Sequence, residues 1–122
     1  VKPILFALVL GHEGAMPRDL AGLSTMIAGV YEYFPNREEV LWGITEAHRQ
    51  DFELVKTALD LGASTVRIGF EDSNYLRPGV QVDNNAVMVA ELTDILHRKG
   101  MAPMTPDEAR AMLRIPPLAG KG

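Results

Sequence analysis

The chain has 122 residues, a length typical of a single domain, and it contains no cysteine, which excludes disulfide bonds and cysteine–zinc sites. It is 47% hydrophobic and 23% charged, as an ordinary globular protein is and a disordered one is not. The net charge of −4 gives no indication of nucleic acid or an anionic membrane as a partner, and the missing cysteine suits the reducing cytoplasm.

The first predicted element is a strand over residues 4–10, a continuous apolar run that ends at Gly11. The opening "VKPILFALVL" could also be taken for a signal peptide. It has a single lysine, however, and no clean cleavage site follows it. The run is also too short to cross a bilayer. We therefore expect a strand that is buried on both faces.

Two helices and a second strand follow. Apolar residues at helical spacing predict a helix over residues 17–30, with Pro17 in its first turn. The second strand is expected over residues 39–44. A second helix is expected over residues 48–61, with Gly62 as its stop.

The third predicted strand lies within "STVRIGFEDSNYL", which begins at Ser64 and reads as buried for six residues. Side chains alternate along a strand, so one face should hold Val66, Ile68 and Phe70. The other face should then hold Arg67, Gly69 and Glu71, and Gly69 would leave space between the two charges. Asp72 would lie just past the end of the strand.

The remaining chain predicts a long loop and two helices. The loop "SNYLRPGVQVDNN" is rich in turn residues, and Asn84 or Asn85 can cap the helix that follows it. That helix has an apolar face and ends at Gly100; the face consists of Met88, Leu92, Ile95 and Leu96. A short last helix is signalled by "TPDEARAML", with its cap, first-turn proline and capping-box partner at Thr105, Pro106 and Glu108.

The order β-α-β-α-β-α-α indicates parallel strands that are joined by crossover helices. Such a piece fits a doubly wound sheet, and it fits equally well the last part of a (β/α)₈ barrel. We expect one unit over residues 1–122, without an internal boundary.

The charges of the third strand suggest chemistry. Arg67 and Glu71 would be about 13 Å apart along a strand, so they should not pair directly unless the strand kinks. Adjacent carboxylates repel each other, and a divalent metal on Glu71 would leave Asp72 free as a base near Arg67. Alternatively, the carboxylates are helix caps or surface residues and the arginine reaches solvent.

Two stretches of the sequence carry a family resemblance. The segments "GASTVRIGFEDSNYLRPGVQVDNNAVMV" and "APMTPDEARAML" resemble the carboxyl-terminal end of the β-keto acid cleavage enzymes, whose type member acts in lysine fermentation. Ser73 stands where the family usually has asparagine. Upstream, "LVLGHEGAMP" and "VLWGITEAHRQ" resemble the family's sixth and seventh strands less closely. There, the region of Glu46, Ala47 and His48 replaces the usual glycine-arginine.

The resemblance implies a (β/α)₈ barrel, of which this chain would form the last three βα units. It implies a homo-oligomeric enzyme that uses acetyl-CoA to convert a β-keto acid into acetoacetate and a new acyl-CoA, without a covalent enzyme intermediate. Members bind a divalent metal, usually zinc, through a His-x-His pair and a glutamate that matches Glu71. Asp72 matches the catalytic base, and Arg67 matches the arginine that pairs with this base.

The sequence departs from the family in one important respect, because it contains no His-x-His pair. Its histidines are scattered at positions 12, 48 and 97. A catalytic zinc ion normally has three protein ligands. We therefore expect a fragment without a complete site. Two alternatives remain open: a non-catalytic, flavodoxin-like module that binds a ligand or partner, and another metal-dependent barrel lyase or aldolase that uses the same glutamate.

Further polar residues are candidates for binding. His12 and Glu13 follow the first strand and would either contact substrate or CoA at the barrel mouth or belong to a plain loop. His48, which we expect to open the second helix, has the same two interpretations. His97 should favour the dipole at the end of its helix. Arg77 could reach a phosphate or only water.

Asn84 and Asn85 could contact CoA, although capping is the simpler interpretation. Four large apolar side chains are expected in the core: Met26, Trp42, Met88 and Met112.

Overall fold

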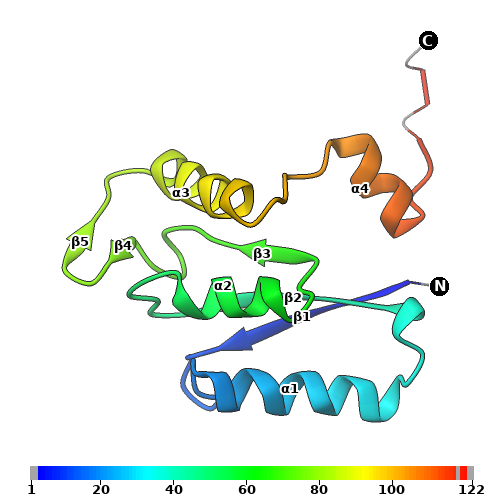
Figure 1. Cartoon of the computed structure of the whole chain (residues 1–122), viewed down its shortest axis with the longest axis horizontal. Coiled ribbons are helices and arrows are strands. Elements are labelled where there is room, and N and C mark those ends of the chain that lie inside the picture. Colours follow the sequence, from blue (N-terminus) through cyan, green and yellow to red (C-terminus); the bar gives the residue numbers. More distant parts are fainter. Residues whose placement is uncertain (1–2, 118, 121–122) are drawn as a thin grey trace.

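The computed structural model describes residues 3–117 and 119–120. Figure 1 shows the course of the chain through ten elements. They are β1 (Ile4–Leu10), α1 (Leu20–Tyr33), η1 (Arg37–Glu39), β2 (Val40–Glu46), α2 (Glu53–Asp60), β3 (Thr65–Arg67), β4 (Tyr75–Arg77), β5 (Val80–Gln81), α3 (Asn85–Arg98) and α4 (Pro106–Leu113).

The main sheet has three parallel strands in the order β1-β2-β3, which confirms the predicted parallel arrangement. In register, Phe6 lies opposite Trp42, and Ile44 lies opposite both Leu8 and Val66. The carboxyl ends of all three strands therefore meet at one edge of the sheet, and in Figure 1 the β4–β5 hairpin lies toward that edge.

One face of the sheet forms the core together with the helices. Trp42 and Ile44 lie on this face and are each only 2% exposed. They pack in one cluster with Leu23 of α1, Val55 of α2 and Ile95 of α3. In Figure 1, α2 lies in front of β2, with α1 and α3 on either side. Because these three helices share a face, the fold is consistent with part of a (β/α)₈ barrel. It gives no support to a flavodoxin-like layout, which has helices on both faces.

The opposite face of the sheet takes no part in this cluster. Leu5 is 42% exposed there, and the cluster also leaves out Val9 and Leu41. Thr65 and Arg67 continue this face and are exposed as well. The expectation that the first strand is buried on both faces is therefore wrong for the described chain, because Leu5 and Ala7 are exposed on the face away from the helices.

The first two helices begin later than predicted. The helix α1 starts at Leu20, because Asp19 caps it by accepting a hydrogen bond from the N–H of Gly22, which leaves Pro17 outside the helix. The helix α2 starts at Glu53, because residues 48–52 form an irregular loop in which His48 has a φ of 57°. The expectation that His48 opens a helix is thus wrong.

The third strand is shorter and less buried than predicted. It ends at Arg67, and only Val66 of its three residues is partly buried. Phe70 is 44% exposed, since it lies in the turn beyond the strand and not on the strand's apolar face. The segment expected to be a long loop contains the antiparallel β4–β5 hairpin.

The last two helices have the predicted caps. The side chain of Asn84 accepts a hydrogen bond from the N–H of Val87 at 3.1 Å. Thr105 and Glu108 form the predicted capping box of α4. No residue of α4 is buried, and Met112 is only partly buried, so the expectation that Met112 belongs to the core is wrong. Trp42 and Met88 are buried as expected, and Met26 packs against the core.

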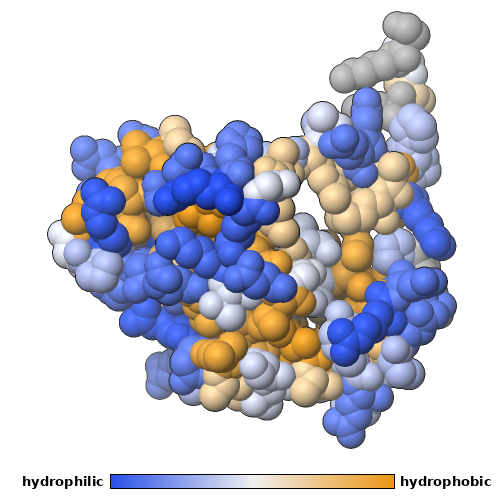
Figure 2. Space-filling view, in the orientation of Figure 1, coloured by the Kyte–Doolittle hydropathy of each residue, from blue (hydrophilic) through white to orange (hydrophobic). Residues whose placement is uncertain are grey.

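A groove of about 670 Å³ runs along the free side of β3. Its walls are the strand itself, α3 and the segment that leads into α4, with Val89, Met101 and Met104 among the lining residues. In Figure 2, apolar side chains gather around the hollow below α4. The unpaired side of β3 is therefore bordered by an apolar surface.

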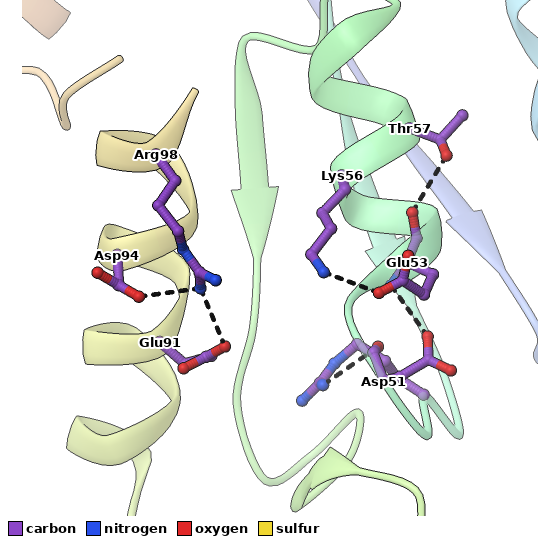
Figure 3. A network of polar contacts seen from close by, with 8 residues as sticks. Asp51, Glu53, Lys56, Thr57, Glu91, Asp94 and Arg98 are labelled. Carbon is purple, nitrogen blue, oxygen red and sulfur yellow. Dashed lines mark hydrogen bonds and ion pairs between the residues drawn. The ribbon is translucent and has the colours of Figure 1, made fainter. Parts of the chain in front are cut away.

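Charged side chains of α2 and α3 form ion pairs within each helix (Figure 3). Lys56 pairs with Glu53 at 2.7 Å, and Arg98 pairs with Asp94 at 2.9 Å. The carboxylate of Asp51 accepts a hydrogen bond from the N–H of Glu53 at the start of α2. Exposed pairs of this kind contribute little to stability, so they mark the solvated face of the helices. Within the described residues, no helix has the length and apolar character needed to cross a membrane.

Candidate active site at the carboxyl edge of the sheet

A tight turn follows β3 and brings its acidic residues back toward the strand. The N–H groups of Asp72 and Ser73 both donate to the carbonyl of Gly69 at 3.0 Å. As a result, Arg67 Nη2 lies 2.6 Å from Glu71 Oε2. The expectation that these two residues are too far apart to pair is wrong, because the chain leaves the extended conformation after Arg67.

Arg67 also contacts Asp72. Its Nε lies 3.2 Å from Oδ2, and its Nη2 donates to Oδ1 at 3.4 Å. The side chain of Asp72 is 5% exposed, whereas that of Glu71 is 84% exposed. Oδ2 of Asp72 is buried and accepts no hydrogen bond within the described part of the chain. The two adjacent carboxylates therefore differ: one is enclosed beside a guanidinium, and the other faces solvent.

The loop after β2 is fastened to the turn after β3. The N–H of His48 donates to the carbonyl of Asp72 at 2.9 Å. The hydroxyl of Ser73 donates to the carbonyl of Arg49 and accepts from the N–H of Tyr75. Ser73 is only 8% exposed. The position of Asp72 thus depends on two hydrogen bonds that join its turn to the loop after β2, one at Asp72 itself and one at the adjacent Ser73.

Arg49 anchors the same loop with a buried guanidinium. Only 2% of the residue is exposed, and its Cζ lies 4.0 Å from the centre of the Phe52 ring. Its Nη2 donates to Met88 Sδ at 3.2 Å, and burial lowers the pKa of Arg49 below its usual value. Sequence reasoning missed this residue, because an arginine in a predicted helix is expected to face solvent.

Glu46 is a second buried charge that the sequence did not single out. It is 6% exposed, Oε1 lies 4.0 Å from Arg18 Nη1, and Oε2 is buried without a hydrogen-bond partner in the described chain. Burial raises the pKa of Glu46 to about 7, although Arg18 and Arg49 oppose the shift. The alternation of side chains along β2 could have revealed Glu46, because this residue lies on the same helix-facing side of the strand as Trp42.

Gly11 permits this arrangement. It has a φ of 85°, and a Cβ at this position would lie 2.6 Å from the carbonyl oxygen of Ala47 and 3.2 Å from Cδ of Arg18. A side chain here would meet both the β2 loop and the arginine that reaches Glu46.

Two of the predicted candidate histidines meet at this edge. The ring centres of His12 and His48 are 6.3 Å apart, and the rings meet edge to face. Glu13 is exposed in the same loop, and Arg77 is exposed at the end of β4. His97 lies in the last turn of α3, away from this edge. Asn84 is the cap of α3, whereas Asn85 Oδ1 accepts from the N–H of Phe70 at 3.0 Å and so helps to hold the turn after β3.

The described residues do not by themselves supply the three protein ligands of a catalytic zinc site. Among residues 3–117 and 119–120, no three His, Asp or Glu side chains gather where they could hold a metal. Glu71, the expected ligand, is exposed and paired with Arg67. This chain therefore offers one carboxylate and no neighbouring imidazole pair to complete such a site.

Comparison with known proteins points to one family. The family model described as β-keto acid cleavage enzyme matches residues 1–115. The chain is 31% identical over 115 residues to a 3-keto-5-aminohexanoate cleavage enzyme of Fusobacterium nucleatum subsp. nucleatum, covering 93% of this chain and 39% of that protein. An enzyme of the same name from Acetoanaerobium sticklandii is also 31% identical, with 93% and 39% covered.

A third relative has a different name. It is the 3,5-dioxohexanoate:acetyl-CoA acetone transferase of Paraburkholderia graminis, which is 29% identical over 107 residues, or 88% of this chain and 33% of that protein. The chain thus spans 33% to 39% of the length of these curated relatives. The family match covers nearly all of the chain and includes the turn that holds Arg67, Glu71 and Asp72. The chain belongs to the β-keto acid cleavage enzyme family.

Proposed function

We propose that this chain is part of an enzyme that converts a β-keto acid and acetyl-CoA into acetoacetate and a new acyl-CoA. The observation that carries the proposal is the buried carboxylate of Asp72 beside Arg67, at the carboxyl edge of a parallel sheet. Parallel α/β folds place their reacting groups at this edge. The names of the relatives refer to different substrates, so we propose the class of β-keto acids as substrate and not one particular acid.

Asp72 is the proposed base. Carbon–carbon bond chemistry next to a carbonyl requires a group that takes and returns a proton, and a positioned carboxylate does this efficiently. The two contacts from Arg67 fix the orientation of the carboxylate. The N–H of His48 and the hydroxyl of Ser73 hold the turn in which Asp72 lies. Catalysis would thus depend on a base that is placed before substrate arrives.

We also propose that the chain supplies the last three βα units of a (β/α)₈ barrel. The one-sided packing of α1, α2 and α3 on the sheet supports this, since barrel helices all lie outside the strands. The opposite face, on which Leu5 and Arg67 are exposed, would then line the interior. The edges of β1 and β3 that face away from β2 would pair with further strands, and the relatives' greater length leaves room for these.

A divalent metal, zinc in particular, is proposed for a complete barrel and not for this chain alone. Glu71 would contribute one ligand, and its exposure leaves its carboxylate accessible. The imidazole ligands would come from outside these 122 residues. Homo-oligomerisation and a cytoplasmic location complete the proposal. They are supported by the open strand edges and by the lack of cysteine.

The test replaces Asp72 by asparagine in a protein that carries this chain within a complete barrel. Acetoacetate formation from acetyl-CoA and a β-keto acid should fall by about 10² to 10⁴ in kcat, the usual contribution of a general base. Asp83→Asn is the matched control, because Asp83 is exposed beyond the β4–β5 hairpin. Normal turnover in Asp72→Asn, with the control equally active, would contradict the role of Asp72.

A further inference from the structure

We propose that His12 and His48 form a two-histidine binding site for a divalent transition-metal ion. The site lies at the carboxyl edge of the sheet, and its proposed ligands do not include Arg67, Glu71 or Asp72, although the backbone of His48 is hydrogen-bonded to that of Asp72. Nothing in the family assignment or in the proposed function requires it.

The parallel register brings the two histidines together. Leu10 at the end of β1 lies opposite Glu46 at the end of β2. His12 and His48 each lie two residues beyond these paired positions. The N–H of Ala47 donates to the carbonyl of Leu10 at 2.9 Å and extends the pairing by one step toward the histidines. Their proximity therefore follows from the sheet itself.

Both backbones are held in place. His48 has a φ of 57°, a conformation that few residues other than glycine adopt, and its N–H is bonded to the carbonyl of Asp72. The His12 carbonyl accepts from the N–H of Ala15 at 3.0 Å, and the N–H of Gly11 donates to the carbonyl of Met16 at 2.9 Å. The loops thus present two imidazoles from fixed points.

The imidazoles themselves are free to bind. Both residues are exposed, and within the described chain neither ring takes part in a hydrogen bond or an ion pair. Neutral imidazole is the commonest protein ligand for zinc and similar ions. The four nitrogen atoms of the two rings therefore have no competing partner among the described residues.

The ring separation fits one ion after a small movement. A Zn–N distance of about 2.0 to 2.1 Å places the centres of two rings on a tetrahedral ion roughly 5 Å apart. The ring centres of His12 and His48 are 6.3 Å apart. Exposed side chains change rotamer readily, so the difference of roughly 1 Å can be closed by rotation of both rings. Water would fill the remaining coordination positions.

Glu71 is not a third member of this site, because no group of three potential ligands gathers within the described residues. Its carboxylate lies against Arg67. The two-histidine site can therefore be tested independently of the role proposed for Glu71.

The experiment titrates the untagged 122-residue chain with ZnCl2 and, separately, with NiCl2 by isothermal calorimetry. The expected result is saturable binding of one ion, weakened at least about tenfold by His12→Ala and equally by His48→Ala. His97→Ala is the matched control and should bind as the unmodified chain does, since His97 lies on α3. Imidazole ¹H–¹⁵N spectra should show both His12 and His48, and not His97, shifting on addition of Zn²⁺.

A Glu71→Gln variant separates this inference from the proposed function. Unchanged ion binding in Glu71→Gln supports the two-histidine site. The inference is overturned if no saturable binding occurs, if only one of the two histidine variants weakens it, or if Glu71→Gln abolishes it while both histidine variants retain it. The last outcome would leave the metal role proposed for Glu71 intact.

Discussion

Arg67 and Asp72 face each other across the turn that follows β3, with Nε 3.2 Å from Oδ2 of a side chain that is 5% exposed. The Arg67 side chain is itself 53% exposed, so the pair spans the boundary between the protein interior and solvent. Through this contact, Arg67 at the end of β3 fixes the position of the buried Asp72 carboxylate.

Arg67→Ala should destabilise the chain, because it leaves the carboxylate of Asp72 buried without its cation. The cost should fall between the roughly 1 kcal/mol of an exposed pair and the 3 to 5 kcal/mol, approximately, of a broken buried pair. Urea denaturation measures it. Arg77→Ala is the control, because Arg77 is exposed. Equal stability of the two variants would show that the Arg67 contact does not stabilise the turn.

Glu46 should make stability depend on pH. Burial raises its pKa from 4.5 to about 7, so the folded chain retains a proton that the unfolded chain has already lost. The stabilisation is complete below about pH 4.5, declines as pH rises toward 7, and is lost above that, for a total of roughly 3 kcal/mol.

Glu46→Gln should flatten this slope, since the amide does not titrate. Glu32→Gln is the matched control, because Glu32 is exposed on α1. Denaturation midpoints at intervals between pH 4.5 and 8 are the measurement. A slope in Glu46→Gln as steep as in the unmodified chain would assign the pH dependence to another group.

Gly43 should tolerate no side chain. A Cβ there would lie 1.7 Å from Thr65 Oγ1 and 2.6 Å from the carbonyl oxygen of Thr65, its partner in the register of β2 and β3. Rotation of Thr65 relieves the first contact but not the second. Gly43→Ala should therefore cost about 1 to 3 kcal/mol or more.

Gly29 provides the control for this change. It lies within α1, and a Cβ there has nothing within 4 Å. Gly29→Ala should be neutral or stabilise by up to about 1 kcal/mol, the difference in helix propensity. The fluorescence of the buried Trp42, next to Gly43, reports the unfolding of both variants. A harmless Gly43→Ala would mean that β3 does not pair with β2 as closely as described.

Ser73→Ala should loosen the connection between the loops after β2 and β3. It leaves the carbonyl of Arg49 and the N–H of Tyr75 without their shared partner, at a cost of about 1 to 3 kcal/mol. Amide hydrogen exchange should be faster at Tyr75. Ser73→Thr retains the hydroxyl and should exchange slowly. If the threonine and alanine variants exchange alike, the hydroxyl is not the element that holds the loops.

The sequence predicts the parts of this fold that depend on local pattern. Apolar runs located β1 and β2, and the capping residues Asn84 and Thr105 located the starts of α3 and α4. The start of α2 was predicted wrongly, because the apolar spacing continues through Phe52, which is buried in the core although it lies before the helix.

The candidate site likewise has a part that the sequence predicts and a part that it does not. Arg67, Glu71 and Asp72 could be chosen from sequence, because charges at the end of an apolar strand are unusual. Their contacts could not, since the apolar alternation predicts a strand that continues past Gly69, whereas the strand ends at Arg67 and the chain turns back onto the Gly69 carbonyl. Arg49 could not be predicted either, because its buried guanidinium contacts Met88, which is 39 residues further along the chain.

The one-sided sheet has a consequence for how the strands respond to mutation. Along β1, alternate residues such as Leu8 and Leu10 face the helices, whereas Leu5 and Val9 do not. Selection for a folded chain should therefore constrain every second position and leave the intervening ones comparatively free. Selection for turnover should constrain the other set as well. A mutational scan of β1 that measures both protein abundance and enzyme activity would separate these two constraints. The positions where substitutions reduce activity but not abundance should recur at every second residue.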